Sequence, residues 1–142
     1  MFMGEYNHTI DTKGRLIVPA KFREELGEAF VITNGNEGCL AIYTNKDWET
    51  FLEKITNMPG NKNKRAIIRF FVSSAETVEV DKQGRILVPA SLREKAGLEK
   101  DVVLAGAIDK IEVWDKTRWD EQTQIDNIDD ITEELSELGL NI

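Results

Sequence analysis

The chain repeats one segment of its own sequence. Residues 11–27 and 81–97 carry the same amino acid at nine of 17 positions, and several other positions keep their apolar character. An internal repeat is one supersecondary unit used twice, so 142 residues are expected to form two halves related by a pseudo-two-fold axis. The identical positions include a turn with an aspartate and an arginine. We expect both turns on one side of the molecule, where a functional site would lie.

The repeat predicts the same local structure in each half: strand, turn, strand, short helix, strand, turn, strand and helix. Asp11 and Asp81 open turns that Gly14 and Gly84 close, because aspartate accepts local backbone hydrogen bonds and glycine supplies a positive φ. A proline after the return strand is expected at the first helical position, where its missing N–H costs nothing. The short helices are expected at 19–26 and 89–96, and further strands at 30–32, 40–43, 102–104 and 111–114.

Longer helices are predicted after each unit. A capping-box start at Thr44 predicts a helix to about residue 57, and Asp115 can cap the matching helix of the second half. Trp48 and Trp119 take equivalent places on these helices and are expected to be core anchors. Residues 62–72 contain Lys and Arg but no acid, and they predict a connecting helix with an apolar face. Its charges are interpreted as a solvated face, with contact to nucleic acid as the less favoured role.

The chain ends in an apolar stripe with heptad spacing. Ile128, Ile131, Leu135, Leu138 and Ile142 follow one another at intervals of three and four residues. The stripe is too short for a self-sufficient coiled coil. We therefore expect this segment to dock on the body of the protein or on a neighbouring subunit.

The net charge of −8 is concentrated in the same region. Residues 115–142 contain nine Asp or Glu against two Lys or Arg, whereas residues 1–114 contain 17 acids and 16 bases. A near-neutral body can still gather its bases on one face, so the overall charge does not exclude a nucleic-acid partner. An acidic, solvated surface with no such partner is the competing interpretation.

The composition points to the cytoplasm. Cys39 is the only cysteine, so no internal disulfide framework is expected. No apolar run is long enough to cross a bilayer, and the first residues lack the basic start and apolar core of a signal peptide. We expect no membrane partner.

No arrangement of residues predicts an enzyme, a metal site or a cofactor. His8 and Cys39 have no ligand spacing, and the chain lacks a phosphate-binding loop, a dinucleotide fingerprint and a Gly-x-Ser-x-Gly elbow. Asp11 and Asp81 could in principle pair as in an aspartic protease. However, each has an arginine four residues later, which favours the ionised carboxylate and lowers its pKa, whereas a shared proton requires the opposite.

The Asp-x-x-Gly-Arg turn is better suited to recognition. The aspartate can hold the side chain of Arg15 or Arg85, and an ordered arginine loses less entropy when it binds a phosphate or a guanine edge. Lys13 and Lys82 add positive charges on the same turns. The alternative is that each pair only stabilises a hairpin, and the duplication of the motif makes this alternative less favoured.

These motifs closely resemble the SpoVT-AbrB family of DNA-binding domains. The matching residues are Asp11, Gly14, Arg15, Val18, Pro19 and Arg23 in the first half and Asp81, Gly84, Arg85, Val88, Pro89 and Arg93 in the second. The resemblance implies an α+β, mainly β fold: a pseudo-two-fold, swapped-hairpin β-barrel of two tandem repeats, with short helices and a C-terminal helix. It implies SpoVT-AbrB domains at 5–47 and 76–119, a helical connector at 48–75 and an acidic helical tail at 120–142.

The same resemblance implies a sequence-specific DNA-binding regulator of transcription, associated with the nucleoid. It would be a homo-oligomer, ring-shaped, that binds repeated boxes of double-stranded DNA in a promoter. The implied target is the cell-division and cell-wall operon that includes its own gene. The DNA-binding residues would be Asp11, Lys13, Gly14, Arg15 and Arg23 with Asp81, Lys82, Gly84, Arg85 and Arg93.

Two other functions stay open. An antitoxin or transition-state regulator of the same superfamily would also bind DNA, but it usually carries a single domain of this type. A scaffold or interaction module held together by the heptad segment would not bind DNA at all.

Overall fold

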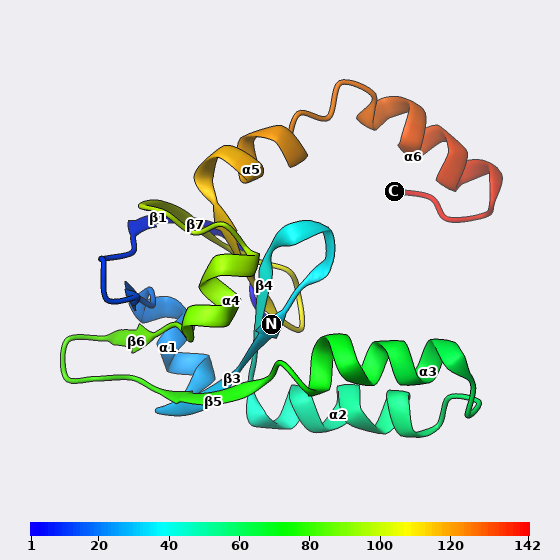
Figure 1. Ribbon diagram of the computed structural model, residues 1–142. Helices are drawn as coiled ribbons and strands as arrows, with labels where there is room; N and C mark the ends of the chain where they lie inside the picture. Colours follow the sequence, from blue (N-terminus) through cyan, green and yellow to red (C-terminus); the bar gives the residue numbers. More distant parts are fainter.

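The computed structural model describes residues 1–142, and its element order repeats once along the chain (Figure 1). The first half contains β1 (Glu5–Thr9), β2 (Arg15–Ile17), α1 (Ala20–Leu26), β3 (Ala29–Asn34), η1 (Asn36–Gly38), β4 (Leu40–Tyr43) and α2 (Asn45–Thr56). The second half contains β5 (Glu76–Glu79), β6 (Arg85–Leu87), α4 (Ala90–Lys95), β7 (Asp101–Gly106), β8 (Ile111–Asp115) and α5 (Lys116–Gln122). Between the halves lie α3 (Lys62–Ile67) and a π-helical turn, η2 (Ile68–Val72), and α6 (Ile128–Glu137) lies near the C-terminus. The predicted order of elements is confirmed in both halves.

The strands of the two halves are paired with one another. The larger sheet has the order β1-β7-β8-β4-β3-β5, all antiparallel, and β2 pairs with β6 in a separate two-stranded ribbon. In this sheet β1 of the first half lies against β7 of the second, and β5 of the second half lies against β3 of the first. The two halves therefore form one body.

The larger sheet is open, because β1 and β5 are its two edge strands. The mixed, mainly β fold class is confirmed. Closure into a barrel and the swapped-hairpin arrangement remain predictions.

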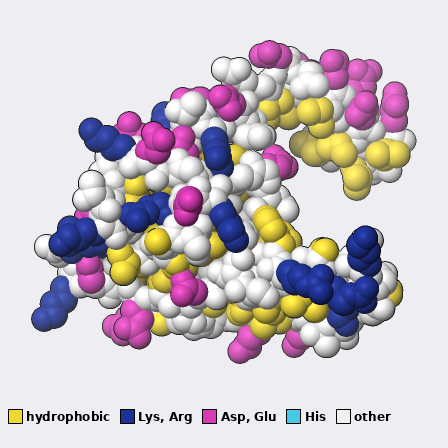
Figure 2. Space-filling view, viewed as in Figure 1, with side chains coloured by type: hydrophobic (Ala, Val, Ile, Leu, Met, Phe, Trp, Pro, Cys, Tyr) yellow, Lys and Arg dark blue, Asp and Glu magenta, His cyan; other side chains and the backbone are white.

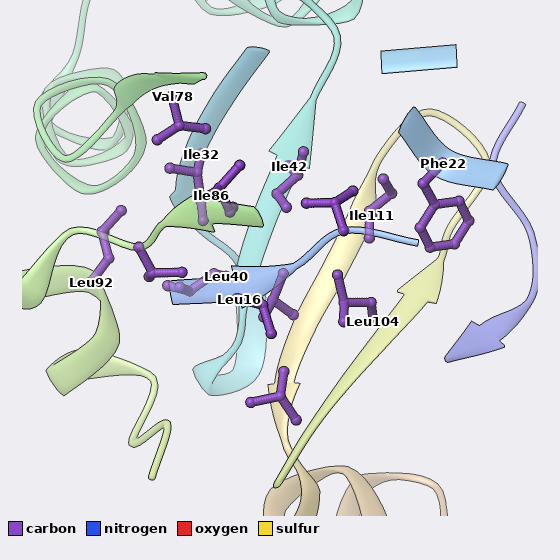
Figure 3. Close-up of a cluster of buried hydrophobic side chains, with 14 of the residues drawn as sticks. Leu16, Phe22, Ile32, Leu40, Ile42, Val78, Ile86, Leu92, Leu104 and Ile111 are labelled. Carbon is purple, nitrogen blue, oxygen red and sulfur yellow. The ribbon is translucent and has the colours of Figure 1, made fainter. Parts of the chain in front are cut away.

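One core is shared by both halves. A single cluster contains 20 buried residues. Figure 3 draws part of it, where side chains from the ribbon, the sheet and the short helices meet. Leu16 of β2 and Ile86 of β6 face each other across the ribbon and are almost completely buried in this cluster. The inner face of the ribbon is thus held against the sheet by apolar contacts.

The helix starts follow from local hydrogen bonding, with one correction. Thr44 accepts from the backbone N–H of Asp47 and Asp115 accepts from that of Thr117, so both predicted caps are confirmed. Pro19 and Pro89 are N-cap residues with extended ψ angles of 138° and 137°. Their expected place at the first helical position is therefore wrong by one residue, because α1 and α4 begin at the following alanines.

The connecting segment is anchored to the sheet by buried polar groups. Instead of the single helix expected, α3 continues into the π-helical turn η2. The Thr33 hydroxyl donates to the carbonyl of Phe71 and the Asn34 amide donates to that of Phe70, at 2.5 and 2.9 Å. Carbonyls at a helix end lack intrahelical partners, so these two residues of β3 satisfy them and fix the connector in place.

The two tryptophans lie outside the main core. Trp48 packs against Tyr43 and Phe51, and Trp119 packs against Trp114. Both are half-buried, so neither belongs to the shared core. Trp119 packs against a smaller cluster of four buried residues that includes Trp114, so its anchoring role is local, and Trp48 is not a core anchor.

The C-terminal helix does not dock on the body in this structure. No residue of α6 is buried, and Ile128 and Leu138 are 52% and 77% exposed. Figure 1 shows α6 standing away from α2 and α3. None of the helices combines the length and apolar content needed to span a membrane.

The orientation of the ribbon predicts different effects at adjacent positions. Leu16 is 0% exposed and Ile17 is 42% exposed. We expect Leu16→Ala to lower the free energy of unfolding by about 2–5 kcal/mol, because it leaves a cavity in the core. Ile17→Ala should cost roughly 0.5 kcal/mol or less, as at other surface positions. Urea denaturation of both variants at equal protein concentration measures the difference, and equal losses would contradict this orientation.

Candidate nucleic-acid interface

The β2–β6 ribbon places the two turn arginines on one surface. Its register pairs Arg15 with Leu87 and Ile17 with Arg85. Cross-strand partners share a face of a sheet, and diagonal neighbours lie about 7–8 Å apart. Since Leu16 faces the core, these four side chains lie on the outer face. The expectation that both turns lie on one side is therefore confirmed.

The first turn is organised by the carboxylate of Asp11. Its Oδ1 accepts from the backbone N–H groups of Lys13 and Arg15 at 3.0 and 2.9 Å, and its Oδ2 accepts from Nε of Arg15 at 2.5 Å. The backbone closes the turn, because the N–H of Gly14 donates to the carbonyl of Asp11. The aspartate thus fixes both the turn and the arginine.

The second turn repeats this arrangement. Oδ1 of Asp81 accepts from the backbone N–H groups of Gln83 and Arg85, both at 2.9 Å, and Oδ2 accepts from Nε of Arg85 at 3.0 Å. In both turns only Nε of the arginine is used by the aspartate. The terminal Nη groups of Arg15 and Arg85 are therefore left to donate outward.

Both turn aspartates are held in their ionised form. The backbone N–H of Arg15 lowers the pKa of Asp11 below its ordinary value of 3.8, assisted by the guanidinium and by the N–H of Lys13. Arg85 and Gln83 lower the pKa of Asp81 in the same way. Partial burial of the carboxylates opposes this effect but does not reverse it.

Each turn is bonded to the strand that leaves the other turn. The N–H of Val18 donates to the carbonyl of Gly84 at 2.9 Å, and the N–H of Val88 donates to that of Gly14 at 2.8 Å. This reciprocal pair of hydrogen bonds joins the two halves directly at the candidate site.

Two further arginines cross between the halves. A Cβ on Gly14 would lie 2.9 Å from Nη1 of Arg93, and a Cβ on Gly84 would lie 2.9 Å from Nη1 of Arg23. Nη1 of Arg93 also donates to the carbonyl of Thr12, at 3.3 Å. Arg23 and Arg93 therefore support the turn of the opposite half, a contact that the repeated sequence did not predict.

The lysines complete the basic surface. Lys13 and Lys82 are exposed on the two turns. Figure 2 shows Lys and Arg side chains at the end of the molecule where the turn before β6 lies in Figure 1. All the residues proposed from the sequence are thus brought together around the ribbon, with Arg15 and Arg85 on its outer face.

Other reactive residues do not gather into a site. Cys39 is buried, and this burial raises the pKa of its thiol to about 12. His8 lies in β1 opposite Val102. No group of three or more His, Cys, Asp or Glu side chains is arranged to hold a metal ion.

The fold and site define a duplicated, mainly β protein in which two Asp-x-x-Gly-Arg turns share one ribbon. The chain belongs to the MraZ family: residues 1–70 and 71–140 each match the model of the MraZ protein, which is described as antitoxin-like.

Similar proteins match over nearly the full chain. The "Transcriptional regulator MraZ" of Lachnoclostridium phytofermentans is 55% identical, with 99% of both chains covered. The protein of the same name from Acetivibrio thermocellus is 48% identical over 99% of this chain and 100% of its own. A solution structure of PHS018 from Pyrococcus horikoshii covers 80% of this chain and 88% of its own at 18% identity, but its TM-score of 0.33 supports no inference.

The glycine at each turn is expected to be required. Gly14 has φ +88°, and a Cβ added there would lie 2.9 Å from Nη1 of Arg93, whereas a Cβ added at Gly60 would have no atom within 4 Å. Gly14→Ala should lower the free energy of unfolding by about 1–3 kcal/mol through backbone strain, and the matched Gly60→Ala should not. Thermal and urea unfolding measure both variants, and equal stability of the two would show that the turn tolerates a side chain.

Acidification should loosen the turns. A depressed aspartate pKa contributes stability above the unfolded-state pKa of about 3.9, and this contribution is lost as pH falls through the lower folded-state value. NMR titration should give carboxyl midpoints below 3.8 for Asp11 and Asp81. In the Asp11→Asn variant the titration of residue 11 should disappear. The pKa of Asp81 should rise little, because each carboxylate is fixed by its own turn. Midpoints at or above 3.8 would contradict this geometry.

Proposed function

We propose that this protein is a sequence-specific, DNA-binding regulator of transcription that presents the outer face of the β2–β6 ribbon to double-stranded DNA. The observation that carries the proposal is the diagonal placement of Arg15 and Arg85 on an exposed two-stranded ribbon. The major groove of B-DNA admits such a ribbon. The regulatory role is supported by the similar proteins, which are named as transcriptional regulators.

The residues around the ribbon divide into groups by their contacts. The free Nη groups of Arg15 and Arg85 bind guanine edges or phosphates. Asp11 and Asp81 hold the two guanidinium groups in position for this contact. Arginine suits this task because two of its N–H groups match the two acceptors of guanine. Lys13 and Lys82 contact phosphates, whereas Arg23 and Arg93 support the turns.

The proposal extends to the assembly and the target. One subunit offers few bases, so a single copy binds weakly. A ring-shaped homo-oligomer presents several copies of the ribbon, and a promoter with repeated boxes presents several copies of the target. Once one ribbon has bound a box, binding of the next ribbon is intramolecular, and the overall affinity rises. The target is the operon for cell division and cell-wall synthesis that includes the protein's own gene. The protein acts in the cytoplasm, in association with the nucleoid. We also propose that the two halves form a swapped-hairpin β-barrel.

Removal of the ribbon arginines tests the proposal. We expect Arg15→Ala and Arg85→Ala each to cost roughly 1–3 kcal/mol of DNA-binding free energy per contact. Their stability should change little, since exposed ion pairs contribute about 0–1 kcal/mol. Lys54→Ala removes an exposed base of α2 and is the matched control. Fluorescence anisotropy with DNA from upstream of the gene measures affinity, and thermal unfolding measures stability.

Conservative variants and salt refine the result. Arg15→Lys should rescue binding poorly if the contact is bidentate to guanine, and well if it is to phosphate. The logarithm of affinity should fall with the logarithm of salt concentration at about −0.9 per neutralised phosphate. Wild-type protein that does not bind this DNA would favour the scaffold alternative. Alanine variants that unfold early yet bind normally when folded would place the DNA surface elsewhere.

A further inference from the structure

The charges of two helical segments are opposite and unmixed. Residues 120–142 contain eight Asp or Glu and no Lys or Arg, whereas residues 58–75 contain four Lys or Arg and no acid. The first segment includes α6, and the second includes α3 and η2. Neither segment shares an ion pair with the other within the chain.

The helix α6 has an apolar face without a partner. Ile128 and Leu138 are largely exposed, and Ile131 is 39% exposed on the same stripe. An amphipathic helix in a folded protein buries its apolar face, and an isolated helix of fewer than about 12 residues is marginal in water. With ten residues, α6 requires a surface to bind.

The segment α3–η2 offers a surface with matching chemistry. Phe70 is 47% exposed there, and Lys62, Arg65 and Arg69 are exposed and have no ion-pair partner. Lys64 is used differently, because its Nζ donates to carbonyls at the end of α2 and fixes the α2–α3 hairpin. These hydrogen bonds hold α3 against the end of α2, and the surface of α3–η2 has an apolar centre among cations without ion-pair partners.

Within one chain the two surfaces do not meet. In Figure 2 the apolar side of α6 and the basic side chains of α3 are separated by open space, and Figure 1 shows the same separation between the helices. The surfaces of α6 and α3–η2 are thus complementary in charge and in apolar character, but they do not contact each other within the subunit. A second copy of this chain supplies both surfaces.

We propose that α6 of one subunit docks on α3–η2 of a second copy, with its apolar stripe over Phe70 and its glutamates beside Lys62, Arg65 and Arg69. The two surfaces differ, so the contact is head-to-tail and repeats from subunit to subunit, closing a ring if the rotation allows it. This inference rests on the homo-oligomer of the proposed function and identifies the interface between its subunits. It does not depend on the DNA-binding ribbon.

Charge reversal with subunit mixing tests this interface. The tail variant Glu133→Lys/Glu134→Lys/Glu137→Lys places cations in the last turn of α6, where the helix dipole favours them. The connector variant is Lys62→Glu/Arg65→Glu/Arg69→Glu. Each variant alone opposes like charges at the interface. Light scattering should therefore show a clear loss of mass for each, while circular dichroism shows retained folding.

An equimolar mixture of the two variants should regain the wild-type mass. The cationic α6 of one variant then meets the anionic connector of the other, and the anionic α6 of the second meets the cationic connector of the first. A control with the same charge change elsewhere, Glu24→Lys/Glu94→Lys/Glu99→Lys, should keep the wild-type mass. An apolar variant, Ile131→Asp/Leu138→Asp, should lose mass. Its mixture with the connector variant should reach only pairs of subunits and not the wild-type mass, because one of the two kinds of contact is intact in that mixture and the other is not.

Several outcomes would overturn the interface. A wild-type monomer would remove it, as would either charge variant assembling at the wild-type mass. A mixture that stays small would indicate docking of α6 on its own connector. A connector variant that keeps its mass but loses DNA binding would make α3 a DNA surface instead. Failure of the proposed function is distinguishable, because the ribbon variants Arg15→Ala and Arg85→Ala should lose DNA binding at unchanged mass.

Discussion

The structure depends on a reciprocal exchange of backbone hydrogen bonds between two turns. Val18 donates to Gly84 and Val88 donates to Gly14, so the end of each ribbon strand is fixed by the other half. This exchange sets the register of the ribbon, and a slip of one residue would turn every side chain to the opposite face. Such a slip would bury Arg15 in the core. The backbone contact between the halves therefore decides which side chains reach the solvent.

Reciprocity also explains why the repeat is most similar around the turns. The aspartate, glycine and arginine form each turn internally, while the arginine of the following helix lies over the glycine of the opposite half. A side chain at Gly14 would displace Arg93, and a side chain at Gly84 would displace Arg23. Each half thus constrains the other, and neither turn can change without consequence for its partner.

Local features of the fold were predictable from the sequence, and contacts between the halves were not. The element order, the caps at Thr44 and Asp115 and the Asp-x-x-Gly-Arg turns depend on neighbouring residues, so their patterns are visible in one segment. Other features depend on segments far apart in the chain. These are the edge positions of β1 and β5, the hydrogen bonds that hold η2 and the contact of Arg93 with the opposite turn.

The distribution of charge connects assembly to recognition. The chain has two groups of exposed bases, one at the ribbon turns and one on α3–η2, and a net charge of −8 that is concentrated in the tail. If α6 of a neighbour covers α3–η2, the tail neutralises the second group and removes it as a competing site for phosphates. The bases of the ribbon turns then stay exposed as a group. Screening by salt acts on exposed charge pairs. Under the proposed function, the same ionic conditions would therefore influence both the assembly and its affinity for DNA, and the acidic segment would restrict DNA to the ribbon.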